Sequence, residues 1–161
     1  MVDASRLRST RSIARAAREA GADALELGFP FSDPVADGPV LQAASARALR
    51  RGTHWGHLLE ALDLASEELP SAVMTYANPV LVHGLTDAIS ELAAHHATGL
   101  IVPDLSWEES GPWRAACRKA GISLVQMATP ATSLARVRVI AHGSRGFVYL
   151  VSHYGTTGRA G

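Results

Sequence analysis

An acidic residue and the proline-rich loop that follows it carry the clearest signal for chemistry in this sequence. Glu26 lies inside the apolar segment 24–27, where burying a charge costs free energy unless the charge has a use. Asp37 lies in loop 28–38, whose path is restricted by its prolines and glycines. In parallel α/β folds such loops form the active face, so the two carboxylates can meet in one pocket as an acid/base pair.

A purely structural role would explain the same two carboxylates. Asp37 would then cap a helix that begins at Pro39, and Glu26 would pair with an arginine. The role of Tyr149, on the last apolar segment, also has two interpretations: its side chain would either face a ligand or pack in the core. The residue types by themselves leave both interpretations open.

Several other chemistries are not supported by the sequence. The only lysine, Lys119, lies at the end of an expected helix, which does not suit a Schiff-base enzyme. Neither GxxxxGK nor GxGxxG occurs, so the corresponding phosphate-binding loops are absent. The pairs His54/His57 and His95/His96 have no cysteine pair or helical His-x-x-x-His spacing beside them. We therefore expect no metal site.

Charge and hydropathy limit which partners and which cellular compartment fit this sequence. Fifteen basic residues balance fifteen acidic ones among 161, so no overall positive field favours nucleic acid or an anionic membrane. No apolar run approaches the roughly 18 residues that span a bilayer. Cys117 has no partner within the chain, which fits a reducing compartment. We expect a soluble, cytoplasmic protein, and we interpret the five arginines of residues 1–20 as an amphipathic helix rather than a transit peptide.

Helical and strand patterns alternate along the whole chain. Their spacing predicts helices over residues 5–20, 39–51, 54–68, 86–96, 112–120 and 133–142. It predicts strands over residues 24–27, 72–76, 100–102, 122–126 and 147–151, with Asn78-Pro79 ending the second. Such alternation is typical of a parallel sheet covered by helices, here in one domain of residues 1–161.

Two α/β architectures fit this pattern. One is an open, doubly wound sheet of five strands. The other is a partial (β/α)₈ TIM barrel, with about five parallel strands and flanking helices. The chain begins with a helix that no strand precedes and ends in a glycine-rich loop, which favours the partial barrel.

Five sequence segments, in order along essentially the whole chain, carry a resemblance to a known family. They are ELGFPFSDPVADGP at 26–39, QAA at 42–44, TYANPV at 75–80, VPDL at 102–105 and GFVY at 146–149. In these segments the chain closely resembles the tryptophan synthase α subunit. The first of them is long enough to be highly specific.

The resemblance implies a TIM-barrel lyase of tryptophan biosynthesis. Such an enzyme cleaves indole-3-glycerol phosphate by a retro-aldol reaction to indole and glyceraldehyde 3-phosphate. It implies a heterotetrameric α₂β₂ assembly in the cytoplasm, in which the β subunit carries pyridoxal phosphate and this chain carries no cofactor. It implies neither a nucleic-acid partner nor a membrane partner.

The resemblance also implies roles for individual residues. Glu26 is expected to transfer the protons, and Asp37 to accept a hydrogen bond from the indole N–H and stabilise the charge that develops there. Tyr149 matches the family's active-site tyrosine, and Met74 and Ile101 match positions that line the indole pocket. Thr157 matches a threonine of the loop that closes over the site, and Gly158 matches part of the phosphate site. Pro30, Asp33 and Asn78 match positions that face the β subunit.

The chain departs from the family at both ends. The family's first strand and last two strands, with most of the phosphate site, have no counterpart in the pattern. We therefore expect little lyase activity from the 161-residue chain alone. An alternative is an inactive homologue that at most docks on a β subunit through residues 29–34, and a third interpretation is a doubly wound domain of unrelated function.

Overall fold

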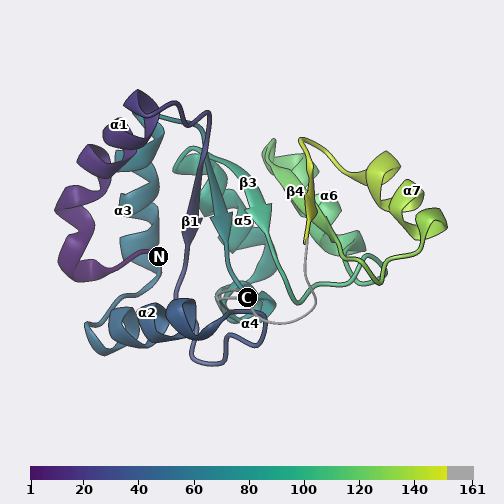
Figure 1. The fold of residues 1–161 in the computed structure, drawn as a ribbon, viewed down its shortest axis with the longest axis horizontal. Coiled ribbons are helices and arrows are strands. Elements are labelled where there is room, and N and C mark those ends of the chain that lie inside the picture. Colours follow the sequence, from purple (N-terminus) through teal and green to yellow (C-terminus); the bar gives the residue numbers. More distant parts are fainter. Residues whose placement is uncertain (152–161) are drawn as a thin grey trace.

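The computed structural model describes residues 1–151 as one sheet with helices packed against it (Figure 1). The strands are β1 (Leu25–Gly28), β2 (Ser71–Met74), β3 (Ala97–Ile101), β4 (Ser123–Ala128) and β5 (Val148–Leu150). The helices are η1 (Ala4–Ser9), α1 (Thr10–Glu19), α2 (Pro39–Arg50), α3 (Trp55–Ser66), α4 (Ala77–His83), α5 (Leu85–Ala94), α6 (Gly111–Ala120) and α7 (Leu134–Gly143).

The strand order distinguishes the two predicted architectures. The strands lie in the order β1-β2-β3-β4-β5, and each neighbouring pair is parallel. A doubly wound sheet reverses its strand order at a switch point, whereas a barrel adds each new strand on the same side. The prediction of a partial TIM barrel with five parallel strands is therefore confirmed, and that of a doubly wound sheet is wrong.

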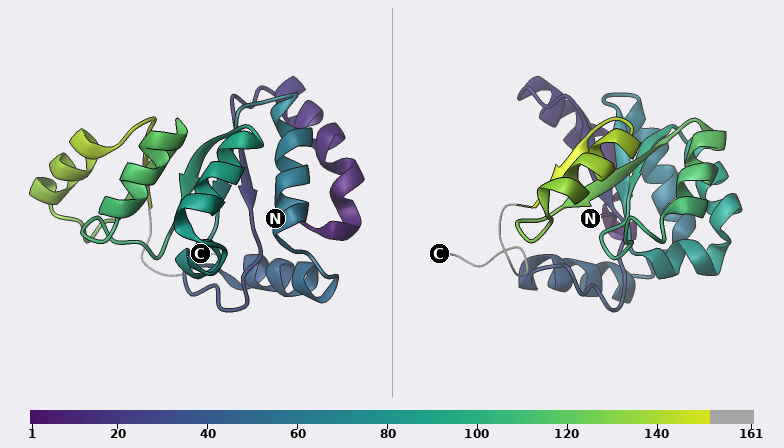
Figure 2. Two further views of the ribbon diagram at one scale, coloured as in Figure 1. Left: turned by 180° about the vertical axis from the view of Figure 1, so that it is seen from behind. Right: turned by 90° about the vertical axis from the view of Figure 1, so that its right-hand side faces the viewer.

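The hydrophobic core lies between the sheet and the helices that cover its outer face (Figure 2). Leu58 and Leu62 of α3 and Leu92 of α5 are fully buried there, together with Val73 and Leu100 from the strands. Side chains alternate along a strand, so the residues between these core positions point to the inner face of the sheet. The inner face is thus free to carry the polar side chains that the sequence places near the strand ends.

Helix α4 corrects one expectation from the sequence. The sequence predicts that Asn78-Pro79 ends the second strand, but β2 already ends at Met74 and Asn78-Pro79 lies in the first turn of this helix. A proline there is tolerated because the first turn needs no N–H donor. The Ala77 N–H, which would otherwise lack a partner, donates to Asp104 Oδ1 at 2.9 Å. Gly84, with φ of 98°, then separates α4 from α5.

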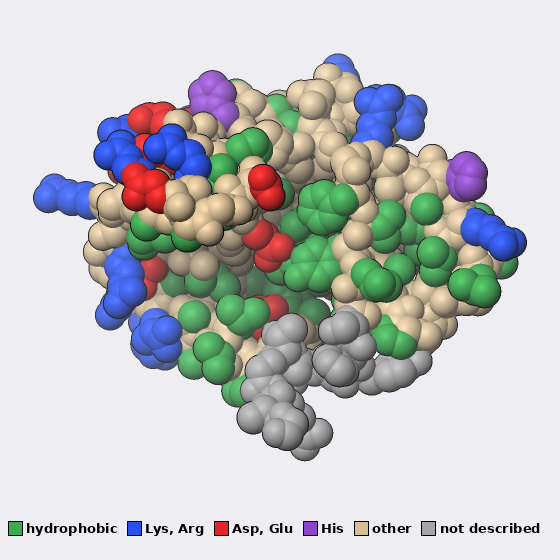
Figure 3. Space-filling model, turned by 45° about the horizontal axis from the view of Figure 1, so that its top comes forward, with side chains coloured by type: hydrophobic (Ala, Val, Ile, Leu, Met, Phe, Trp, Pro, Cys, Tyr) green, Lys and Arg blue, Asp and Glu red, His purple; other side chains and the backbone are tan. Residues whose placement is uncertain are grey.

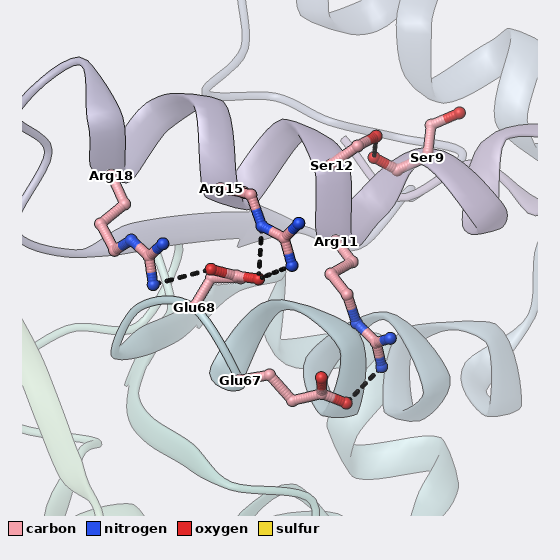
Figure 4. A network of polar contacts seen from close by, with 7 residues as sticks. All are labelled: Ser9, Arg11, Ser12, Arg15, Arg18, Glu67 and Glu68. Carbon is pink, nitrogen blue, oxygen red and sulfur yellow. Dashed lines mark hydrogen bonds and ion pairs between the residues drawn. The ribbon is translucent and has the colours of Figure 1, made fainter.

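The amino-terminal helix is also more complex than the pattern predicts. The expected helix over residues 5–20 is split into the 3₁₀ helix η1 and the α-helix α1. Arginines of α1 bind the carboxylates that follow α3: Arg11 pairs with Glu67, while Arg15 and Arg18 both contact Glu68 at 2.8 Å (Figure 4). Exposed ion pairs are individually weak, but the Glu68 side chain is only 6% exposed and contacts two arginines of α1.

A buried hydroxyl gives a direct test of this packing. Thr75 is 1% exposed, and its Oγ1 has no hydrogen-bond partner among the described residues. Because an unpaired buried hydroxyl is unfavourable, we predict that Thr75→Val raises the free energy of unfolding by about 1 kcal/mol. Urea denaturation measures this change.

Thr98→Val is the control for a hydrogen-bonded threonine: Thr98 is exposed on β3, and its hydroxyl donates to the Ser71 carbonyl at 3.0 Å. That variant should lose stability. Destabilisation by Thr75→Val as well would contradict the packing described here.

Candidate active site

A cavity of about 210 Å³ lies on the inner face of the sheet, at the carboxyl ends of β1 and β2. Both predicted catalytic carboxylates line it. On the concave side, Figure 3 shows hydrophobic and acidic side chains around a recess, with the basic side chains at the periphery. The lining residues are Met1, Glu26, Gly28, Phe29, Asp37, Leu41, Met74, Thr75 and Tyr76.

Two hydrogen bonds hold the proline-rich loop over this cavity. The Phe31 N–H donates to Ser45 Oγ of α2 at 3.0 Å, and the Ala36 N–H donates to Tyr76 Oη at 2.9 Å. The rings of Phe31 and Tyr76 also pack together, with centroids 5.3 Å apart. The loop is therefore attached both to α2 and to the segment after β2, which brings Asp37 back toward β1.

Glu26 lies on the open inner face, where its side chain reaches solvent. Desolvation by the surrounding protein raises its pKa, the nearby amino terminus lowers it, and the negative charge of Asp37 raises it further. Within residues 1–151 no arginine forms an ion pair with this carboxylate. The alternative in which Glu26 pairs with an arginine is therefore not supported.

Asp37 is half-buried beside Tyr76. Burial raises the pKa of Asp37, and a hydrogen bond with the Tyr76 side chain acts in the opposite direction. The residue that caps α2 is Gly38, so Asp37 does not occupy the cap position that the structural interpretation would need. Two carboxylates that share a cavity and both have raised pKa values are suited to proton transfer.

The predicted substrate-binding residues are partly brought together. Met74 lines the cavity, and the charge of Glu26 is the main cause of a raised pKa of Tyr149, which places that tyrosine near Glu26. Ile101 is opposite Met74 in the sheet register and is 1% exposed, but it does not line this cavity. Thr157 and Gly158 lie outside the described residues.

The three residues predicted to face a partner differ in their exposure to solvent. Asp33 and Asn78 are exposed on the loop and on α4. Pro30 is fully buried in this chain, and its role at a partner surface stays a prediction.

The sequence analysis missed one residue that the site depends on. Tyr76 is 4% exposed, lines the cavity and contacts the loop at two points. Burial raises the pKa of its hydroxyl to about 12, so this group remains a neutral donor. Its position two residues after Met74, on the same side by strand alternation, was the available signal.

Comparison with known proteins gives one consistent result. A sequence model of the family described as "Tryptophan synthase alpha chain" matches residues 2–161. The tryptophan synthase alpha chain of Methanosarcina acetivorans is 43% identical over 150 residues, which is 93% of this chain and 55% of the relative. That of Synechococcus elongatus is 44% identical over 154 residues, or 94% and 58%. The chain thus spans a little over half the length of these relatives.

Solved structures agree with the sequence matches. Tryptophan synthase of Mycobacterium tuberculosis superposes with a TM-score of 0.87 at 36% identity, covering 95% of this chain and 60% of that one. Tryptophan synthase subunit alpha of Legionella pneumophila gives a TM-score of 0.84 at 34% identity, covering 90% and 56%.

The hydrogen bond between Tyr76 and Asp37 can be tested by titration. This bond lowers the pKa of Asp37, so Tyr76→Phe should raise that pKa above its value in the wild-type chain. Carboxyl ¹³C shifts followed against pH measure it. Tyr149→Phe, which removes a hydroxyl near Glu26 instead, should leave the pKa of Asp37 unchanged; equal shifts in both variants would contradict the assignment.

The raised pKa of Glu26 also predicts how stability depends on pH. A carboxyl whose pKa is higher in the folded state than in the unfolded state destabilises the fold once it ionises. Glu26→Gln should therefore raise the denaturation midpoint near neutral pH, and the gain should vanish below the ordinary value of 4.5. The denaturation midpoint should be measured near neutral pH and again below pH 4.5. Glu60→Gln, on the exposed side of α3, is the control and should leave the midpoint unchanged at both pH values. A gain for Glu26→Gln at both pH values would disprove this explanation.

Proposed function

Because the chain belongs to the tryptophan synthase alpha chain family, we propose that its cavity is built for the lyase reaction of that family. The reaction is the retro-aldol cleavage of indole-3-glycerol phosphate to indole and glyceraldehyde 3-phosphate. The observation that carries the proposal is the convergence of Glu26 and Asp37 in one cavity at the carboxyl end of the sheet. This end of the sheet forms the active site in TIM-barrel enzymes.

The two carboxylates suit the two charges that develop during such a cleavage. Breaking the carbon–carbon bond leaves an electron pair on the indole ring, so the ring carbon must gain a proton while the glycerol hydroxyl loses one. Glu26, reached by solvent and with a raised pKa, is suited to deliver and take these protons. Asp37, held by Tyr76, is suited to accept from the indole N–H and stabilise positive charge there.

The apolar part of the cavity fits an indole ring. Phe29, Leu41 and Met74 line it beside the carboxylates. We propose that Met74 contacts the indole and that Tyr149, near Glu26, contacts the substrate, with Ile101, Thr157 and Gly158 completing the substrate site. No cofactor is needed for proton transfer by carboxylates, and we propose that this chain binds none.

The proposed partner is a tryptophan synthase β subunit, which in the family carries pyridoxal phosphate. The exposed positions Asp33 and Asn78 lie at the carboxyl end of the sheet, beside the exposed apolar side chains of Val35, Leu81 and Val82. An exposed apolar group bordered by polar residues is typical of a protein interface. The name of the Mycobacterium tuberculosis neighbour, "tryptophan synthase", fits an α₂β₂ assembly.

The cytoplasm is the compartment we propose, as for a biosynthetic enzyme with a free cysteine. Cys117 is buried and unpaired. In the part of the chain that the structure describes, no helix has the length and apolarity needed to cross a membrane. Residues 1–151 also hold no group of three or more potential metal ligands.

Indole release from indole-3-glycerol phosphate tests the lyase proposal. It should be measured for the chain alone and for the chain fused to the remaining part of a curated relative. In whichever form is active, Glu26→Gln should reduce the rate by at least about 100-fold, because it removes the proton-transferring group. Glu60→Gln should retain the rate. Absence of indole release from both forms, or full activity of Glu26→Gln, would contradict the proposal.

Docking is tested separately from chemistry. Asp33→Lys reverses a charge in the proposed interface and should weaken binding to a tryptophan synthase β subunit by about tenfold. Asp23→Lys makes the same change just before β1, at the opposite end of the sheet, and should leave binding unchanged. Biolayer interferometry measures both affinities, and equal affinity of the two variants would place the interface elsewhere.

A further inference from the structure

Two groups of arginines lie in the amino-terminal third of this chain. Those of α1 are neutralised by Glu67 and Glu68, as described above (Figure 4). A second group gathers where η1 meets the end of α2, and all of its side chains are exposed. We call this group the arginine patch; it consists of Arg6, Arg8, Arg47, Arg50 and Arg51.

Contacts around Asp3 bring the two segments together. Arg51 Nη1 contacts Asp3 Oδ2 at 2.8 Å and Ser5 Oγ at 3.0 Å, so the end of α2 lies against η1. A 3₁₀ helix has three residues per turn, so Arg6 follows Asp3 by one turn and Arg8 follows Ser5 by one turn.

The same argument places the arginines of α2. Arg47 precedes Arg51 by four residues, which puts both on one face of the helix, and Arg50 is adjacent. The patch is therefore continuous across η1 and the last turn of α2.

The charge of the patch is not compensated. Residues 1–9 and 38–54 contain five arginines and a single acid, Asp3, in a chain whose formal net charge is zero. Asp3 is already engaged, since hydrogen bonds from Ser5 are the main cause of its lowered pKa and Arg51 contributes. Apart from Arg51, no member of the patch forms an ion pair within residues 1–151.

From this placement we propose that the arginine patch is a docking surface for an acidic segment of another protein. Arginine guanidinium groups recognise carboxylates through paired N–H donors. Proteins that bind single-stranded nucleic acid add aromatic side chains on which bases stack, and residues 1–9 and 38–54 contain no Phe, Tyr or Trp. A carboxylate-rich polypeptide is therefore the partner that the residue types favour. This proposal is independent of the lyase chemistry.

Fluorescence anisotropy with a labelled polyglutamate peptide tests the proposal on the 161-residue chain. We expect binding at low ionic strength that weakens as salt is added, because the contacts are between exposed charges. Arg47→Gln/Arg50→Gln should weaken binding by about fivefold, as expected for the loss of two exposed ion pairs. Arg118→Gln/Arg138→Gln is the matched control, since both of its arginines are exposed on helices elsewhere and unpaired among the described residues, and it should bind as the wild-type chain does.

Three outcomes would overturn the proposal. No binding of polyglutamate by the wild-type chain at low salt would show that the arginine patch is not a docking surface for acidic segments. Equal weakening by the control pair would show a non-specific attraction spread over the chain. Tighter binding of a polyuridine probe of equal length than of polyglutamate, lost in Arg47→Gln/Arg50→Gln, would assign the patch to nucleic acid instead. Circular dichroism of each variant confirms that its helices are retained.

Discussion

The candidate site depends on the attachment of one loop to two neighbouring elements. The hydrogen bonds from the loop to Ser45 and Tyr76 fix the path of residues 29–37 between β1 and α2. Glu26 is positioned by the sheet itself, but Asp37 reaches the cavity only because the loop returns to it. A further hydrogen bond, from Gln42 Nε2 to the Asp37 carbonyl at 2.9 Å, attaches the end of the loop to α2.

The parallel sheet supplies the other half of the geometry. Glu26 pairs with Ala72 in the register, and Gly28 pairs with Met74, so β1 and β2 end at the same level. Polar chemistry is then confined to the inner face and carboxyl end, while the outer face packs against the helices. The raised pKa values of both carboxylates follow from this arrangement, because each is partly desolvated in the same small cavity.

The sequence predicted the features that depend on local pattern. Strands and most helices were found because apolar residues repeat with the right period, and the Glu26–Asp37 pair because a charge in an apolar strand is unusual. It failed where tertiary contacts decide. Asn78-Pro79 has residue types that end a strand, yet it lies in α4, where Asp104 accepts a hydrogen bond from the Ala77 N–H. Strand alternation after Met74 places Tyr76 on the side of the cavity, but its hydrogen bond to a loop 40 residues earlier depends on the tertiary structure.

The family resemblance supplied what the residue types could not decide. Physical reasoning alone left Glu26 and Asp37 open between catalysis and structure. Among residues 1–151 the geometry shows no arginine paired with Glu26, and Gly38 rather than Asp37 is the residue that caps α2. The geometry also shows that Pro30 is fully buried in this chain, which the resemblance alone does not reveal. Residue-by-residue transfer from a family is thus most secure where the local contacts of this chain support it.

The most direct test of the central claim, that the two carboxylates share one site, is electrostatic coupling between them. The pKa of Glu26 should be measured by ¹³C NMR titration in the wild-type chain and in Asp37→Asn. Because the negative charge of Asp37 raises the pKa of Glu26, removing that charge should lower it. An unchanged pKa of Glu26 in Asp37→Asn would show that the carboxylates do not sense each other, and would contradict the account.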